Sequence, residues 1–399
     1  MQETPRANRL HIAIFGRRNA GKSSLINAIT GQDIALVSDK AGTTTDPVYK
    51  AMEILPLGPC VLIDTAGIDD EGELGVLRIK KTREVLDKTD LALLVIDPLQ
   101  GISTFELELV EEFRRRNIPF IPVINKIDQA TPSPADIEKE IKEKVHLVSA
   151  VSKEGIDQLK ELIALKAPSD YQEPAIIGDL LQPGDMCILV TPIDSAAPKG
   201  RLILPQVQTI RDILDHDSQA LVVKETELAK ALASLKNPPR IVITDSQAFK
   251  EVERILDPSI PLTSFSILYA RYKGDLKILL AGIEKLKEIK PGDKILIAEA
   301  CTHHRQQDDI GTVKIPRLLE KIAGGKLDLH WSSGSGYPEN LSSFELIIHC
   351  GGCMLNRRQM LSRINKAREK GVPITNYGLF LAYANGILER ALAPLVHKL

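Results

Sequence analysis

The sequence predicts an α/β protein: an N-terminal doubly wound, mostly parallel sheet followed by two smaller α/β domains. Over residues 10–165, short apolar runs alternate with helical patterns, which is typical of parallel strands joined by crossover helices. The polar stretch 167–174 is interpreted as a linker. Two more α/β segments follow it, one starting near Met186 and one near Ser264.

We place the domains at 1–170, 171–263 and 264–399. Candidate strands of the first are Leu10–Phe15, Cys60–Ile63, Leu91–Ile96, Phe120–Ile124 and His146–Val148. The second has strand candidates Met186–Val190, Ala220–Val223 and Arg240–Thr244, with helical patterns at Val207–Leu214 and Glu225–Leu235. The third has strand candidates Lys294–Ala298, Leu327–Trp331, Phe344–Ile348 and Pro373–Asn376, with a helical pattern at Asn356–Lys370. The second segment holds no catalytic constellation, so we expect it to be structural or oligomeric.

Composition and charge narrow the class of protein. The 399 residues are 43% hydrophobic and 26% charged, which is ordinary for a globular chain. With 51 basic and 53 acidic residues, the basic excess typical of nucleic-acid binding is missing. The start of the chain lacks an apolar signal region, and no apolar run reaches membrane-span length. We therefore expect a cytoplasmic protein with no nucleic-acid or membrane partner.

A phosphate-binding motif follows the first candidate strand. Residues 16–24, GRRNAGKSS, match G-x-x-x-x-G-K-[ST] between a strand and a helix. The glycines let the backbone wrap around phosphate so that its amides face the anion. Lys22 would reach the β- and γ-phosphates, and Ser23 would give its hydroxyl oxygen to Mg²⁺. The expected nucleotide contacts of this loop are Gly16, Asn19, Ala20, Gly21, Lys22, Ser23 and Ser24.

Three further motifs stand at the carboxyl ends of later strands, where open α/β sheets bind ligands. Asp64 would support Mg²⁺, and the amide of Gly67 would sense the γ-phosphate. Asp128 can accept two hydrogen bonds from guanine N1–H and N2–H₂, a donor pair that adenine lacks. The motifs therefore predict GTP, with a base pocket made of Asn125, Lys126, Asp128, Ser149 and Ala150.

These motifs resemble the translation-factor-related GTPases, within the branch of cation-dependent G proteins. That branch has an asparagine at the position of Asn19 and a switch I similar to Ser38–Thr44. The resemblance implies that Thr44 binds Mg²⁺ and that Asn19, with main-chain oxygens of Ser38–Thr43, binds K⁺. The cation would stand where an arginine finger otherwise places positive charge. Lys22, Thr44 and Asn19 are thus the expected catalytic residues.

The residue after Gly67 is Ile68, where many GTPases have a water-orienting glutamine. An apolar side chain cannot orient water, so hydrolysis needs another group. K⁺ together with Glu71 or Glu73 is one candidate, although exposed loop carboxylates are more often solvated acids.

Cysteine and histidine cluster in two loops of the third segment. Cys301-Thr302-His303-His304 follows one candidate strand, and His349-Cys350-Gly351-Gly352-Cys353 follows another. Loops at the carboxyl ends of parallel strands can converge on one point. Spacing alone leaves three interpretations open: a structural zinc site of Cys₃His type, a redox dithiol, and an iron–sulfur cluster held by three cysteines. In the cluster, His303 or His349 could be the fourth ligand, or that place could stay exchangeable.

A cation-dependent G domain followed by C-x-H, a long gap and H-C-x-x-C resembles the maturation GTPases of iron-only (FeFe) hydrogenase, the HydF family. The stretch 42–48, GTTTDPV, also looks like the switch I of that family. The resemblance covers the whole chain and its three-part layout.

This resemblance implies a 4Fe-4S cluster held by Cys301, Cys350 and Cys353. Proteins of the family receive a precursor of the di-iron subcluster, which bears CO and cyanide, and pass it to apo-hydrogenase. The implied partners are two radical-SAM maturases and the FeFe hydrogenase, and the second domain resembles a dimerisation domain that makes a homodimer. Two rival functions are a zinc-stabilised regulatory GTPase and a ribosome- or RNA-associated GTPase. The latter predicts a basic RNA-binding domain, which the balanced charge does not indicate.

Overall fold

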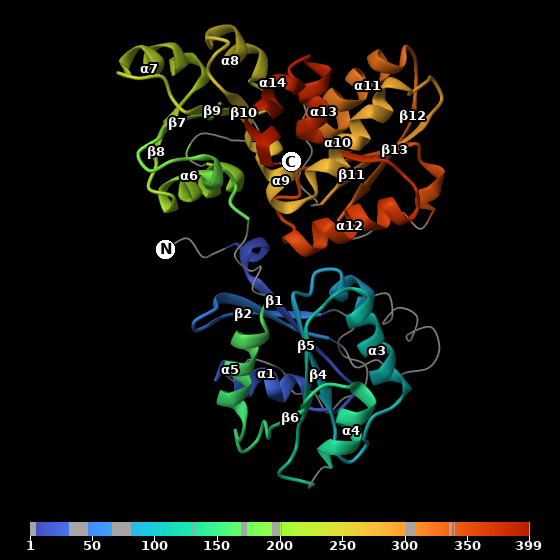
Figure 1. Ribbon diagram of the computed structural model, residues 1–399. Coiled ribbons are helices and arrows are strands. Elements are labelled where there is room, and N and C mark those ends of the chain that lie inside the picture. Colours follow the sequence, from blue (N-terminus) through green and yellow to red (C-terminus); the bar gives the residue numbers. More distant parts are fainter. Residues whose placement is uncertain are drawn as a thin grey trace. The chain divides into compact units, whose positions relative to one another are not determined.

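The computed structural model describes residues 5–31, 47–65, 81–130, 133–168, 174–193, 200, 202–300, 309–334, 337–338 and 340–398. The chain forms two compact units, Met1–Gln172 and Glu173–Leu399. Among the described residues, the first unit contains a six-stranded sheet and the second contains two four-stranded sheets (Figure 1).

The sheet of the N-terminal unit has the order β2-β3-β1-β4-β5-β6, with β2 antiparallel to β3 and the other neighbours parallel. Its strands are β1 (Leu10–Phe15), β2 (Val48–Ile54), β3 (Gly58–Asp64), β4 (Leu91–Ile96), β5 (Phe120–Ile124) and β6 (His146–Leu147). The helical elements are η1 (Arg6–Asn8), α1 (Lys22–Thr30), α3 (Thr104–Arg115), α4 (Pro134–Ile141) and α5 (Ile156–Lys166).

Both faces of this sheet are covered by helices. Along β1, alternate residues point to opposite faces, as the strand period of two requires. Leu10, Ile12 and Ile14 join an apolar cluster with residues of α1 and α5. Ala13 and Phe15 join a second cluster with residues of α3 and α4. The strand is therefore buried along its whole length and reads as an unbroken apolar run. The predicted doubly wound, mostly parallel sheet is confirmed.

The first sheet of the C-terminal unit has the parallel order β10-β9-β7-β8. It contains β7 (Met186–Val190), β8 (Gln219–Val223), β9 (Ile241–Thr244) and β10 (Leu262–Ser264). The accompanying helical elements are η3 (Gly178–Leu180), α6 (Leu204–Asp215), η4 (Glu225–Glu227), α7 (Leu228–Ser234) and α8 (Phe249–Ile255).

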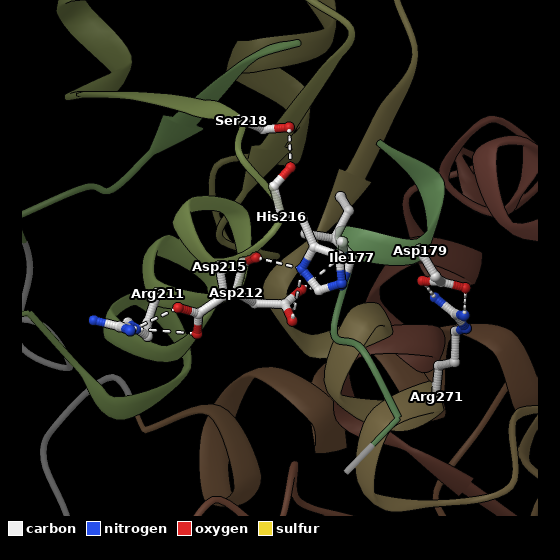
Figure 2. A network of polar contacts seen from close by, with 9 residues as sticks. Ile177, Asp179, Arg211, Asp212, Asp215, His216, Ser218 and Arg271 are labelled. Atoms are coloured by element: carbon white, nitrogen blue, oxygen red, sulfur yellow. Dashed lines mark hydrogen bonds and ion pairs between the residues drawn. The ribbon is translucent and has the colours of Figure 1, made fainter. Parts of the chain in front are cut away.

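Polar contacts fix the segment that leads into this sheet (Figure 2). The carboxylate of Asp212, on α6, accepts hydrogen bonds of 2.7 Å from the backbone N–H groups of both Ile177 and Gly178. Beside them, Arg271 donates to Asp179 in a two-pronged ion pair, with one bond of 3.0 Å. Since Asp212 satisfies two backbone donors at once, it holds the start of the segment against α6.

The second sheet has the parallel order β12-β11-β13-β14. It contains β11 (Lys294–Glu299), β12 (Asp328–Ser333), β13 (Leu346–His349) and β14 (Ile374–Asn376). Its helical elements are α10 (Leu276–Glu284), η5 (Lys285–Lys287), η6 (Ile310–Lys314, a π-helix), α11 (Ile315–Ala323), η7 (Leu341–Ser343), α12 (Arg357–Glu369), α13 (Tyr377–Ala384), α14 (Leu388–Leu392) and η8 (Ala393–Lys398).

Helix α9 (Phe265–Lys273) connects the two sheets of the C-terminal unit. It begins where β10 ends, and the Ser264 side chain caps it by accepting the N–H of Ile267. It contacts α6 of the first sheet and α12 and α13 of the second. Its buried residues share one apolar cluster with both sheets. The boundary at residues 263 and 264 thus lies at a buried junction, and the limits 171–263 and 264–399 stay predictions.

Some elements differ from their sequence-based predictions. The prediction omitted β2, because this edge strand is mostly exposed or half-buried and is not a continuous apolar run. It also omitted β10, which has three residues. The single helix expected at Glu225–Leu235 is a 3-10 turn, η4, followed by α7. Among the described residues, none of the helices combines the length and apolar character that crossing a bilayer requires.

Candidate nucleotide site and cysteine loop

The loop after β1 has a backbone shape that requires glycine at two places. A Cβ on Gly16 would lie 2.3 Å from the carbonyl oxygen of Val95, on the neighbouring strand β4. Gly21 has φ +85°, and a Cβ there would lie 2.3 Å from Asn125 Nδ2. Any larger residue would strain the loop or displace these neighbours. The two glycines of the motif therefore serve the packing of the loop against β4 and the Asn125 motif.

Lys22 begins α1 and is directed back into the loop. Its buried ammonium donates to the carbonyl oxygens of Gly16, at 2.8 Å, and Arg17, at 2.7 Å. A positive charge and the N-terminal end of α1 thus meet at one place, which suits an anion such as a phosphate.

Ser23 and Asp64, the two predicted Mg²⁺ residues that the structure describes, lie together. The Ser23 hydroxyl donates to Asp64 Oδ2 at 2.6 Å. Burial raises the pKa of the Asp64 carboxyl, while the Ser23 hydrogen bond and the charges of Lys22 and Lys50 lower it. A hydroxyl and a carboxylate fit Mg²⁺, which prefers oxygen ligands. A bound divalent cation would favour the ionised carboxyl.

The predicted base pocket is cross-linked by hydrogen bonds between its motifs. The Asn125 amide donates to the Ala20 carbonyl at 3.1 Å and accepts the backbone N–H of Ala150 at 3.0 Å. The Ser149 hydroxyl donates to Asp128 Oδ1 at 2.5 Å. One buried asparagine therefore joins the phosphate loop to the base loop, and Ser149 orients the exposed carboxylate expected to read guanine.

Two acidic residues that sequence reasoning missed hold basic residues of these motifs. Asp97, at the end of β4, pairs with the Lys126 ammonium at 2.8 Å. Glu106, on α3, is almost fully buried and accepts from Arg17 of the phosphate loop at 2.8 Å. The signal for Asp97 was its position directly after an apolar strand. Glu106 stood in a capping box, three residues after Ser103, which indicated only a helix start.

The remaining predicted site residues fall into two groups. Asn19 is exposed in the loop with φ +60°, and Ser24 is half-buried on α1. Ser38, Thr43, Thr44, Gly67, Ile68, Glu71, Glu73, Cys301, His303 and His304 lie outside the described residues.

The cysteine loop, residues 350–356, follows β13 at the carboxyl edge of the second C-terminal sheet. The backbone N–H of Ala300, just after β11, donates to Cys350 Sγ at 3.1 Å. This contact brings the residue before Cys301 against the sulfur of Cys350. A backbone N–H directed at sulfur favours its thiolate form.

A buried lysine fixes the far side of the cysteine loop. Lys273, the last residue of α9, is 2% exposed. Its ammonium donates to the carbonyl oxygens of Cys353 at 3.1 Å and Leu355 at 2.7 Å. At the end of the loop, Asn356 caps α12 by accepting the N–H of Gln359. The loop is thus held between the end of one helix and the start of another.

His349, a predicted metal ligand, is engaged by two hydrogen bonds in the structure. Its Nδ1 lies 2.6 Å from the carbonyl oxygen of Cys350, which only accepts, so Nδ1 carries the proton. Its Nε2 accepts from Arg363 at 2.8 Å. Burial, followed by the charge of Arg363, lowers the pKa of His349 to about 3. The imidazole is neutral with both nitrogens engaged, so in this arrangement it has no lone pair for a metal.

The remaining cysteines divide into two chemical kinds. Cys60 and Cys187 are fully buried in strands, and burial raises the pKa of their thiols to about 11 and about 12. Such thiols are inert. Cys350 and Cys353 are only half-buried. Among the described residues no three histidine, cysteine or acidic side chains gather to hold a metal. Cys350 and Cys353 thus place two half-buried thiols on one loop, while Cys301, the predicted third ligand, lies outside the described residues.

Comparison with known families decides the identity of the C-terminal unit. The family described as "Hydrogen maturase F dimerization domain" matches residues 176–274, and "Hydrogen maturase F tetramerization domain" matches residues 277–394. Together the two matches span more than half of the chain. This chain belongs to the HydF family of hydrogenase maturation GTPases. The predicted family is thereby confirmed, and the two family descriptions support an oligomer.

The N-terminal unit of this HydF protein is a GTPase domain. Residues 11–126 match the family described as "50S ribosome-binding GTPase". The tRNA modification GTPase MnmE of Aquifex aeolicus is 36% identical over 163 residues, which are 41% of this chain and 35% of that protein. GTPase Der of Wolinella succinogenes is 38% identical over 178 residues, which are 41% of this chain and 36% of that protein. The chain spans about a third of the length of these curated relatives.

Solved structures resemble this chain over about half of its length or less. Era of Aquifex aeolicus bound to GDP.AlF4- is 22% identical, covers 54% of this chain and 93% of that chain, and has a TM-score of 0.37. The G domain of the T. maritima FeoB iron transporter is 26% identical, covers 40% of this chain and 99% of that chain, and has a TM-score of 0.31.

Replacing Lys273 by methionine should destabilise the C-terminal unit by about 3 kcal/mol, because two buried carbonyl groups lose a charged donor. The single tryptophan, Trp331, lies on β12, so its fluorescence during urea unfolding reports on this unit. Lys277→Met, at an exposed position of α10, is the matched control and should change stability little. Equal unfolding midpoints for the two variants would show that Lys273 does not hold the loop.

Proposed function

We propose that this HydF protein is a GTPase scaffold for assembly of the di-iron subcluster of FeFe hydrogenase. It binds a 4Fe-4S cluster in its C-terminal domain and delivers the subcluster precursor to apo-hydrogenase. The observation that carries the proposal is the cysteine loop. Cys350 and Cys353 are half-buried, and the Cys350 sulfur receives the backbone N–H of Ala300, the residue before Cys301, inside a domain of the hydrogen maturase F family.

The nucleotide site supports the GTP part of this proposal. Asp128 reads guanine, Lys22 contacts the phosphates, and Ser23 with Asp64 holds Mg²⁺, joined by Thr43, Thr44 and Gly67 from the switch segments. The hydrogen bonds among Ser23, Asp64, Asn125 and Ala150 preorganise this constellation. Bound K⁺ supplies positive charge to the transition state. Asn19, exposed on the phosphate loop, is the side chain that holds it.

In the C-terminal domain, Cys301, Cys350 and Cys353 hold the cluster. The cluster supplies an attachment point for the subcluster precursor. His303 remains a candidate for the fourth position, which otherwise stays exchangeable, whereas the two hydrogen bonds of His349 give it a positioning role. The bonds from Lys273 set the path of the loop between Cys353 and α12.

GTP acts as a switch on partner affinity and does not supply the cluster chemistry. The partners are apo FeFe hydrogenase and two radical-SAM maturases, which supply the precursor. The chain assembles as a homodimer through residues 171–263, or as a larger oligomer through both domains, in the cytoplasm. The matches to dimerisation and tetramerisation families support this arrangement.

Asp128→Asn should shift nucleotide preference from GTP toward XTP, because an amide cannot accept both guanine hydrogen bonds. The loss for GTP should be about tenfold to a hundredfold in Kd, the range of one charged hydrogen bond. Competition binding with GTP, XTP and ATP measures it. Unchanged GTP affinity would remove Asp128 from base recognition.

Hydrolysis should be faster in K⁺ than in Na⁺ at equal ionic strength. Asn19→Ala should abolish the difference while GTP binding persists, since the backbone amides and Lys22 still hold the phosphates. Phosphate release at saturating GTP measures the rate. Equal hydrolysis rates of the unmodified chain in the two salts would show that K⁺ takes no part in the reaction.

Replacing Cys301, Cys350 or Cys353 by serine should cut iron loading severalfold after anaerobic reconstitution with iron and sulfide, because each substitution removes a thiolate ligand. GTPase activity should stay near that of the unmodified chain. Cys187→Ala, at a buried thiol of β7, is the control and should load normally. Stoichiometric zinc with no iron in the unmodified chain would instead indicate a zinc-stabilised regulatory GTPase.

A further inference from the structure

Two buried donor groups next to the cysteine loop have no acceptor among the described residues. They are the hydroxyl of Tyr337, in the segment after β12, and Nε–H of Arg363, on α12. Arg363 is 4% exposed, and the Tyr337 hydroxyl oxygen is shielded, although Tyr337 as a whole residue is half-buried. Buried polar groups are almost always paired, so two such donors at one place indicate an acceptor outside the described residues.

The two side chains are locked together against the residue that precedes Cys350. The Arg363 guanidinium lies over the Tyr337 ring, 5.2 Å from its centre. Its Nη1 donates to His349 Nε2 at 2.8 Å, and its Nη2 donates to the carbonyl oxygen of Gly334. The ring of Tyr337 meets the His349 ring edge-on, with centres 6.3 Å apart. These contacts orient Arg363, and Nε is the guanidinium nitrogen that has no acceptor among the described residues.

The Tyr337 hydroxyl keeps its proton and lies within electrostatic reach of Cys350. Burial raises the pKa of Tyr337, Arg363 lowers it, and the charge of the Cys350 sulfur raises it again. A tyrosine hydroxyl carries its proton at neutral pH and is therefore a donor. Both orphan groups are therefore donors, and one belongs to a permanent cation. The Tyr337 hydroxyl and the Arg363 Nε–H would therefore both bind best to an anionic acceptor.

We propose that Tyr337 and Arg363 form a donor pair that hydrogen-bonds the sulfur of an iron–sulfur group held at Cys350, either its inorganic sulfide or the thiolate. This inference rests on the proposed cluster site and adds to it the residues that tune the cluster. His349 positions this pair, because its Nδ1–H donates to the Cys350 carbonyl oxygen and its Nε2 accepts a hydrogen bond from Arg363.

Donors directed at cluster sulfur stabilise the reduced state more than the oxidised state, because reduction adds negative charge. They therefore raise the reduction potential. Removing the Tyr337 hydroxyl should lower that potential. Since the hydroxyl has no acceptor among the described residues, its removal should cost the cluster-free protein no hydrogen bond.

Tyr337→Phe in the full chain tests the pair. After anaerobic reconstitution with iron and sulfide, a potentiometric titration followed by EPR should show a reduced-to-oxidised ratio roughly tenfold lower at a fixed potential. For a one-electron couple that equals a downward shift of about 59 mV. Iron content should match the unmodified chain, and the cluster-free variant should melt at the same or a higher temperature.

Tyr383→Phe is the matched control, because Tyr383 lies on α13 near Lys287 and should leave the potential unchanged. If the Tyr337→Phe variant binds the cluster and its reduction potential is unaltered, the donor pair is overturned and the cluster site still stands. A marked loss of stability in the cluster-free variant would also overturn it, by showing that the hydroxyl bonds to protein. Absence of iron from the unmodified chain would overturn the cluster site as well.

Discussion

Parallel strands bring their carboxyl ends to one edge of a sheet, and both candidate sites of this chain depend on that constraint. In the GTPase domain, β1, β3 and β5 end at the phosphate loop, Asp64 and Asn125. In the C-terminal unit, β11 and β13 end at Ala300 and Cys350, whose backbone N–H and sulfur meet at 3.1 Å. Residues far apart in sequence are thereby neighbours before any ligand binds.

The two sites are stabilised in different ways. The nucleotide site is held by hydrogen bonds among its own motif residues, such as Ser23 to Asp64 and Asn125 to Ala20 and Ala150. The cysteine loop is held by residues outside its motif. Lys273 comes from the helix that joins the two C-terminal sheets, and Arg363 comes from α12. The helix that carries Lys273 also packs on α6 of the dimerisation family region, so that region and the cysteine loop share one buried element.

Features that depend on neighbouring residues in the sequence were predicted, whereas features that depend on contacts between distant residues were not. Buried parallel strands such as β1 and β4 are continuous apolar runs, so their bounds were predicted to the residue. Motif spacing likewise identified Ser23 and Asp64. The hydrogen bond between His349 and Arg363 could not be predicted from the sequence, because Arg363 lies fourteen positions later on another element. Lys273 resembled an ordinary basic residue at a helix end, and only the fold buries it.

The central claim is delivery of a subcluster precursor, and hydrogen evolution measures it most directly. The chain is purified from cells that also make the two radical-SAM maturases and is incubated with apo FeFe hydrogenase. Hydrogen evolution should appear with this preparation and be absent with chain from cells lacking the maturases. If the hydrogenase stays inactive although the chain carries its 4Fe-4S cluster and hydrolyses GTP, the scaffold function proposed for it is contradicted.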